Sequence, residues 1–163
     1  MKNYKVCILA AGIGSRSFDP NINKALLPLD GKAVLSNIID KFDQKQKFVI
    51  ALGYLEDQVK QYLMHAHPKT KFEFVSIKKY FGLGSGPGHS LLCCEHKLKS
   101  PFILTSADTV VLENISNPYE NWMGVAPIKN TSDFCTVQTN GNFITRIDDK
   151  TLNDNRLAWI GLA

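Results

Sequence analysis

A glycine-rich segment near the start of the chain carries the residue types that bind a chain of phosphates. Gly12 and Gly14 follow an apolar stretch and precede Arg16, and Lys24 comes eight residues after Arg16. Glycines let backbone N–H groups approach phosphate oxygens closely, and arginine and lysine supply positive charge. The pattern therefore predicts a loop whose backbone, from Gly12 to Ser15, cradles a polyphosphate.

The apolar stretch before this loop predicts the strand that positions it. Residues 4–10 read Tyr-Lys-Val-Cys-Ile-Leu-Ala, a short run that ends in small residues. Such a run fits a strand that is buried on both faces of a parallel sheet. Open α/β sheets bind ligands at the carboxyl ends of their strands, which is where this loop would lie.

Other phosphate-binding loops make demands that this sequence does not meet. A dinucleotide-binding loop needs a third glycine, where this chain has Ser17, and a carboxylate after the next strand, where it has Gly53 and Tyr54. A Walker-type loop needs Gly-Lys-Ser/Thr, but Gly31-Lys32 is followed by alanine. A purely structural corner between strand and helix would explain the glycines but not the two cations.

Two later segments hold further candidate residues. Asp108 follows a short apolar strand predicted at residues 101–105, where a carboxylate suits a magnesium ion beside a triphosphate, or the capping of a turn. Residues 82–90 form a glycine- and serine-rich turn before a predicted helix. This turn is either a nucleotide contact or a plain loop with a helix N-cap.

The rest of the chain alternates helices and strands and then continues with strands alone. Helical spacing predicts helices at residues 33–42, 55–65 and 88–97, and further strands are predicted at 47–52 and 71–77. Strands without helices are then predicted at residues 122–128, 133–139, 142–148 and 157–163, with a hairpin signal at Asn140-Gly141. The alternation predicts a mostly parallel, doubly wound sheet, and residues 1–163 show no linker, so we expect a single domain.

Composition and charge indicate an ordinary small enzyme domain. The chain has 163 residues, of which 44% are hydrophobic and 21% charged, and a net charge of +4. Its lysines are scattered, which favours mild attraction for anionic substrates over a nucleic-acid interface. The sequence shows neither an apolar run of roughly 18 residues nor a signal peptide, so we expect a cytoplasmic protein with no membrane partner.

Cysteines and histidines point to no metal centre. We expect buried free thiols, because no Cys-x-x-Cys pair occurs among Cys7, Cys93, Cys94 and Cys135. His65 and His67 fit the surface end of a helix better than a metal site, since no other ligand is close in the sequence.

The first segment resembles the signature of nucleotidyltransferases that act on sugar 1-phosphates and phosphocholine. Residues 9–16 read Leu-Ala-Ala-Gly-Ile-Gly-Ser-Arg, and Lys24 leads into Ala-Leu-Leu-Pro-Leu. The resemblance extends from Val6 to Gly161. It implies a Rossmann-like three-layer α/β/α sandwich, with a mostly parallel central sheet and extra antiparallel strands in the C-terminal third.

The resemblance also implies a role for individual residues. Arg16 would act on the β- and γ-phosphates, Lys24 on the α-phosphate and the incoming phosphate, and Asp108 would hold Mg²⁺. Nucleotide contacts are implied for Leu9, Ala10, Ala11, Gly12, Gly14 and Ser15 of the first loop, and for Ser85, Gly86 and Gly88 of the second. Gly161, in Trp159-Ile160-Gly161, would border the acceptor site.

The implied reaction needs no general base. A substrate phosphate attacks the α-phosphorus of a nucleoside triphosphate and pyrophosphate leaves; the nucleophile is already an anion because the second pKa of a phosphate monoester is about 6. Ala10-Ala11 favours CTP or UTP, and the expected acceptor is a sugar 1-phosphate for surface-polysaccharide synthesis. The alternatives are a cytidylyltransferase for phosphocholine or another non-sugar phosphate, and a non-catalytic nucleotide-binding domain.

The chain departs from the family pattern at its C-terminal end. Members of the family continue further and carry a second metal-binding aspartate, for which Asp148 and Asp149 are candidates, although a turn is the simpler interpretation of this pair. We therefore expect the domain to be incomplete at its C-terminus. An exposed final strand would then favour a homo-oligomer.

Overall fold

The computed structural model describes residues 4–14 and 19–163. The chain divides into two compact units, Met1–Tyr119 (unit 1) and Glu120–Ala163 (unit 2). The expectation of a single domain over residues 1–163 stays a prediction. In the described ranges, no helix is long and apolar enough to cross a membrane.

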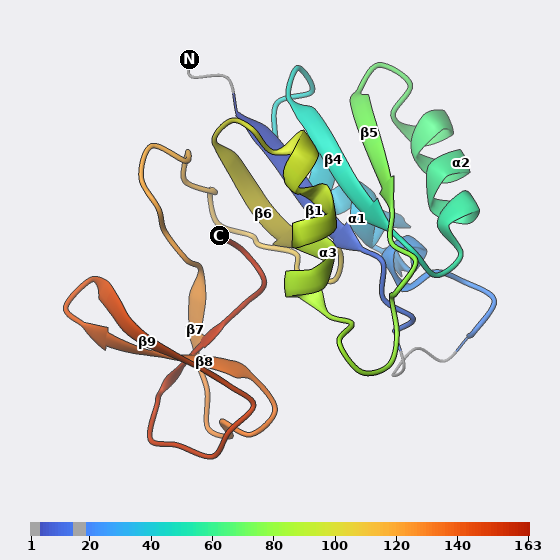
Figure 1. The fold of residues 1–163 in the computed structure, drawn as a ribbon. Coiled ribbons are helices and arrows are strands. Elements are labelled where there is room, and N and C mark those ends of the chain that lie inside the picture. The colour runs from blue at the N-terminus through green and yellow to red at the C-terminus, as the bar shows by residue number, and fades with distance from the viewer. Residues whose placement is uncertain (1–3, 15–18) are drawn as a thin grey trace. The chain divides into compact units, whose positions relative to one another are not determined.

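Unit 1 is built around a four-stranded parallel sheet (Figure 1). The strands of its main sheet are β1 (Lys5–Ala10), β4 (Lys47–Leu52), β5 (Lys71–Ser76) and β6 (Phe102–Ser106), in the order β5-β4-β1-β6. β1 pairs in parallel with β4 on one side and β6 on the other. Residues 6–10 are buried, which confirms the prediction of a strand covered on both faces.

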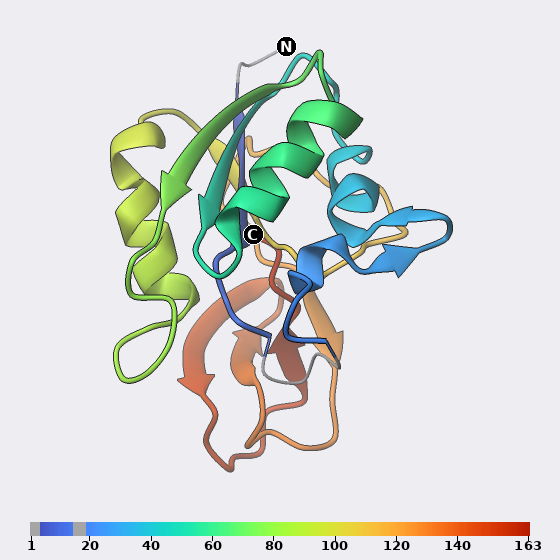
Figure 2. The same cartoon turned by 90° about the vertical axis from the view of Figure 1, so that its right-hand side faces the viewer.

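Helices cover both faces of this sheet. They are α1 (Val34–Ile39), α2 (Glu56–Ala66) and α3 (Pro87–Cys94). The connections β1–α1–β4 and β4–α2–β5 step in one direction across the sheet, and β5–α3–β6 steps back. Right-handed crossovers therefore place α3 on the face opposite α1 and α2, as Figure 2 shows. The three-layer α/β/α arrangement with a parallel central sheet is confirmed.

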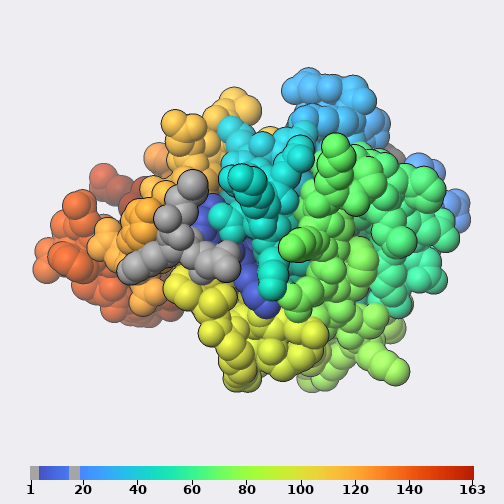
Figure 3. Space-filling model, turned by 90° about the horizontal axis from the view of Figure 1, so that it is seen from above, coloured from blue at the N-terminus to red at the C-terminus, as the bar shows by residue number. Residues whose placement is uncertain are grey.

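Two predicted helices are shorter than expected. A hairpin of β2 (Pro28–Leu29) and β3 (Lys32–Ala33) takes the start of the first, because Asp30 and Gly31 have positive φ and reverse the chain. This hairpin projects from the body of unit 1 (Figures 2 and 3). The helix predicted at residues 88–97 begins one residue earlier, at Pro87, and continues after α3 as the 3-10 turn η2 (Glu95–Lys97).

A polar cluster joins α1 to the end of α2. The Ser36 hydroxyl lies 2.7 Å from the Tyr62 hydroxyl and 2.7 Å from Nε2 of His67. His65 is exposed, as predicted for a helix end. His67 is half-buried and caps the helix, because its backbone N–H donates to the Leu63 carbonyl. Burial lowers the pKa of His67 below its ordinary value of 6.5.

The cysteines behave as the sequence predicts for free thiols. None of the four forms a disulfide, and Cys7 in β1 and Cys94 in α3 are both buried. Cys93 and Cys135 are half-buried. The expectation of buried free thiols therefore holds for Cys7 and Cys94, whereas Cys93 and Cys135 are only partly buried.

Unit 2 is an antiparallel sheet. Its strands are β7 (Val125–Pro127), β8 (Cys135–Asn140), β9 (Phe143–Asp149) and β10 (Leu157–Trp159), in the order β7-β10-β8-β9. β8 and β9 form the predicted hairpin, and Gly141 takes a φ of +57° in its turn. β10 is shorter than the strand predicted at residues 157–163, since Gly161 has a φ of +85° and bends the chain.

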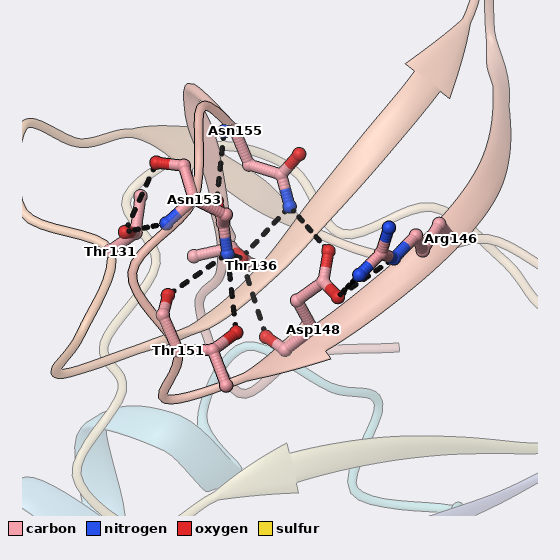
Figure 4. A network of polar contacts seen from close by, with 7 residues as sticks. All are labelled: Thr131, Thr136, Arg146, Asp148, Thr151, Asn153 and Asn155. Carbon is pink, nitrogen blue, oxygen red and sulfur yellow. Dashed lines mark hydrogen bonds and ion pairs between the residues drawn. The ribbon is translucent and has the colours of Figure 1, made fainter.

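A buried threonine organises the polar side of unit 2 (Figure 4). Thr136 is fully buried, and its hydroxyl accepts from Asn153 Nδ2 at 3.1 Å and from Asn155 Nδ2 at 3.0 Å. Asn155 Nδ2 also donates to Asp148 at 3.0 Å, and Arg146 holds the same carboxylate in an ion pair of 2.6 Å. These contacts tie β8, β9 and the segment before β10 together.

The cluster around His67 predicts a stability that depends on pH. The unfolded chain protonates the His67 ring near pH 6.5, whereas the folded chain binds this proton only at lower pH. The stabilisation that comes from the neutral ring is therefore complete above pH 6.5. It is lost as the pH falls through 6.5 toward the lower pKa of the folded chain. We expect the His67→Gln variant to lose less stability than the unaltered chain between pH 7.5 and 5.5, measured by urea unfolding.

The matched control for this measurement is His65→Gln. That ring is exposed and contacts the Gln61 carbonyl of its own helix. It should leave the pH dependence unchanged. An equal slope in the His67 variant and the unaltered chain would contradict the prediction.

The network in unit 2 predicts a second stability effect. Asn155→Ala removes the bonds to Thr136 and Asp148, and each of the hydrogen bonds lost costs about 0.5–1.5 kcal/mol. Hydrogen exchange of the β8 and β9 amides should accelerate accordingly. Asn130→Ala, which removes exposed bonds to Asp133 and Ser132, should change exchange in these strands by less than about 0.5 kcal/mol. Similar effects of both variants would rule out the network's role.

Candidate functional site

The ends of three neighbouring strands anchor the glycine-rich segment. The Leu9 carbonyl, in β1, accepts the Ala107 N–H at 3.0 Å on the β6 side. The Ala11 carbonyl accepts the Tyr54 N–H at 3.0 Å on the β4 side. Because all three strands are parallel, residues 11–14, the turn after β4 and the turn after β6 share the carboxyl edge of the sheet.

Two predicted catalytic residues meet at this edge. Lys24 is the first residue of the 3-10 turn η1 (Lys24–Leu26), and Asp108 lies two residues beyond the end of β6. The Lys24 Nζ lies 2.7 Å from Asp108 Oδ2, although 84 positions separate the residues in the sequence. The side chains are 27% and 56% exposed, so both charges remain accessible to a ligand.

Gly14 is needed for the placement of Lys24. It has a φ of +70°, and a Cβ atom added to it would lie 2.9 Å from Cδ of Lys24. The lysine stem therefore lies directly against the glycine loop. A Cβ added to Gly12 would meet no described atom within 4 Å. Arg16 and Ser15, predicted beside these glycines, lie outside the described residues.

The remaining predicted residues of the first loop are buried. Leu9, Ala10 and Ala11 are each less than a tenth exposed. Only their backbone could contact a nucleotide, and the Leu9 and Ala11 carbonyls are already bonded to neighbouring strands. Their role in nucleotide binding stays a prediction.

The second predicted loop leads from β5 into α3 at the same edge of the sheet. Ser85 donates from its hydroxyl to the Gly82 carbonyl at 2.7 Å, a bond within the loop. Gly86 is the N-cap of α3 with a φ of +147°, and Gly88 lies in the first turn of that helix. The placement fits the expected nucleotide contact, which stays a prediction.

Sequence reasoning gave no role to the residue that holds the Lys24 turn. Asn23 is fully buried and caps η1, its Oδ1 accepting from the Ala25 N–H at 3.0 Å. Its Nδ2 donates to the Tyr54 carbonyl at 2.6 Å. Asparagine is a preferred N-cap residue, so its place before a short helical turn was a usable signal.

Gly161, the predicted acceptor-site residue, belongs to unit 2. It is buried in a bend after β10, where Gly124 accepts from the Ile160 N–H at 3.1 Å and donates to the Leu162 carbonyl at 2.9 Å. Its contact with an acceptor stays a prediction.

One carboxylate of the edge fits a magnesium ion. In the part of the chain that the structure describes, no group of three or more His, Cys, Asp or Glu side chains is placed to hold a metal. Mg²⁺ commonly takes only one or two carboxylates and completes its shell with substrate phosphates and water, so the half-exposed Asp108 suits it. Asp148, a candidate second ligand, lies in β9 rather than in a turn and is held by Arg146 and Asn155.

Comparisons with known proteins agree with this fold. The model of the MobA-like NTP transferase domain family matches residues 6–116. The Bifunctional protein GlmU of Methanococcus vannielii is 27% identical over 138 residues, which are 80% of this chain and 31% of that protein. The chain spans about a third of the length of the curated relatives it matches.

Solved structures share the fold at lower identity. UDP-glucose pyrophosphorylase complexed with UDP-glucose matches with a TM-score of 0.74 and 19% identity, over 99% of this chain and 75% of that one. The CTP:phosphocholine cytidylyltransferase of Streptococcus pneumoniae matches with a TM-score of 0.70 and 21% identity, over 99% and 70%. The family model matches more than half of the residues of this chain, so the chain belongs to the MobA-like NTP transferase domain family.

Proposed function

We propose that this chain is a nucleotidyltransferase domain that transfers a nucleoside monophosphate from a nucleoside triphosphate to a phosphorylated small molecule. The observation that carries the proposal is the ion pair of Lys24 and Asp108 beside the glycine loop, at the edge of the sheet where α/β folds bind ligands. Family membership supports the same reaction class.

The chemistry is a displacement at the α-phosphorus. An oxygen of the acceptor phosphate forms the new bond, the bond from the α-phosphorus to the bridging oxygen breaks, and pyrophosphate leaves with that electron pair. No side chain needs to remove a proton, because the acceptor is already an anion near neutral pH. The protein must instead align two anions that repel each other and offset the charge that develops.

We assign each of the predicted residues a separate part in this alignment. The Lys24 amine neutralises the α-phosphate and the incoming phosphate, and the backbone at Gly12 and Gly14 orients the triphosphate. Arg16 acts on the β- and γ-phosphates. Asp108 holds Mg²⁺, which supplies further positive charge when bound.

The ion pair is a resting arrangement that a nucleotide can replace. Partly exposed ion pairs contribute only about 0–1 kcal/mol to stability. A phosphate can therefore replace Asp108 as the partner of Lys24 at a small cost in free energy. Lys24 thus keeps its amine at the edge of the sheet before the nucleotide arrives.

We favour CTP or UTP as donor and a sugar 1-phosphate as acceptor, in a cytoplasmic pathway to surface polysaccharide. The resemblance to UDP-glucose pyrophosphorylase supports the fold required for such a donor and acceptor. The shared fold of a phosphocholine cytidylyltransferase keeps phosphocholine as the second candidate acceptor. Pyrophosphate release with a panel of sugar 1-phosphates and phosphocholine separates them, and nucleotide binding without release would indicate a non-catalytic domain.

The donor is tested by thermal unfolding with Mg²⁺ and CTP, UTP, dTTP, ATP or GTP. A nucleotide at 100 times its dissociation constant should add about 2.7 kcal/mol to stability. We expect a shift with CTP or UTP that Lys24→Ala strongly reduces at the same nucleotide concentration, while stability without nucleotide changes by no more than about 1 kcal/mol.

The matched control is Lys60→Ala. Lys60 pairs with Glu56 at 3.0 Å on α2 and is 28% exposed, close to the 27% of Lys24. It should keep the full nucleotide shift. An undiminished shift in Lys24→Ala would overturn the assigned role.

Gly14→Ala tests the contact between the loop and Lys24. The new methyl group would displace the lysine stem, so nucleotide affinity should fall by about tenfold, equivalent to 1.4 kcal/mol. Gly31→Ala is the control, since Gly31 has a φ of +80° but its Cβ would meet nothing within 4 Å. Titration calorimetry should show weakened binding only in the Gly14 variant; equal affinities in the two variants would argue against the contact.

A further inference from the structure

Two side-chain amides hold the segment that leads to Lys24. The Gln58 side chain, on α2, accepts the Asn23 N–H at 3.2 Å and donates from Nε2 to the Asn21 carbonyl at 2.7 Å. A single amide thus offers the backbone one acceptor and one donor, as the edge of a strand would. The segment is tied to α2 without being part of a sheet.

Asn23 extends this attachment to the glycine loop. Its Nδ2 donates to the Tyr54 carbonyl at 2.6 Å, and the Tyr54 N–H donates to the Ala11 carbonyl at 3.0 Å. Two hydrogen bonds and one residue therefore connect the cap of the Lys24 turn to the start of the loop. Asn23 is 0% exposed, so it cannot itself contact a nucleotide.

The residue directly after this cap carries the positive charge. Asn23 caps η1 through the Ala25 N–H, and Lys24 is the first residue of that turn. From there the lysine stem lies against Gly14 and its amine reaches Asp108. A lysine carries its amine on a flexible four-carbon stem. The position of its backbone therefore sets the region that the amine can reach.

We propose that Asn23, supported by Gln58, is a positioning residue that sets the distance between the Lys24 amine and the glycine loop for nucleotide binding. The inference rests on the proposed function and deepens it. A buried amide that is hydrogen-bonded through both its oxygen and its nitrogen resists displacement, because a shift leaves polar groups unpaired in the interior. Small errors in the position of a binding group reduce its effect strongly.

A double-mutant cycle separates positioning from general stability. Asn23→Ala should weaken the affinity for Mg²⁺ with CTP or UTP by about tenfold when Lys24 is present, and by less than about twofold in the Lys24→Ala background. Asn23→Ser keeps a capping oxygen and should restore part of the affinity. Gln58→Ala, at a half-buried position, should show the same coupling to Lys24 with a smaller loss even if Asn23→Ala folds poorly.

Asn37→Ala is the matched control. It removes two bonds from a side-chain amide to backbone carbonyls in the same unit, to Leu29 at 2.9 Å and Ala33 at 3.3 Å. It should lower stability without any coupling to Lys24.

The outcomes distinguish the inference from the proposed function. Equal losses in both backgrounds, or unchanged affinity in the Asn23 and Gln58 variants, would overturn the positioning role and leave the proposed function standing. Failure of the unaltered chain to bind any nucleoside triphosphate would overturn the proposed function and this inference with it.

Discussion

The two-sided parallel pairing of β1 is the constraint on which the candidate site depends. Because β4 and β6 both run parallel to β1, the three strands end at one edge, and their backbone bonds continue beyond the strands through Leu9 and Ala11. A loop on its own could not hold Gly14 beside Lys24. Ordering the loop costs conformational entropy, and the apolar packing of the buried strands offsets that cost.

Burial and charge are divided sharply at this edge. Asn23, which is neutral, is fully buried with its hydrogen bonds made, whereas Lys24 and Asp108 keep part of their surface in solvent. This division follows from the cost of removing a charge from water, which far exceeds the cost of burying a bonded amide. Rigid support therefore comes from neutral groups, and the charged groups stay free to change partners.

Unit 2 shows why the type of a residue does not by itself assign its role. Asp148 invited interpretation as a metal ligand because the family carries a second aspartate. In the structure its carboxylate pairs with Arg146 and accepts from Asn155, next to the buried Thr136, and its role as a metal ligand stays a prediction. The contacts that an aspartate makes depend on its neighbours in the folded chain, here Arg146 of its own strand and Asn155 before β10.

The sequence by itself determined the strand-loop-helix order of unit 1, the hairpin at Gly141 and the family, because periodicity, turn residues and a spaced signature are local properties. It placed helix ends less well, since the β2–β3 hairpin depends on two residues with positive φ. Only the tertiary structure decided that Lys24 meets Asp108 and that Asn23 and Gln58 hold the Lys24 turn. These contacts join residues from separate elements, and their partners follow from how the elements pack.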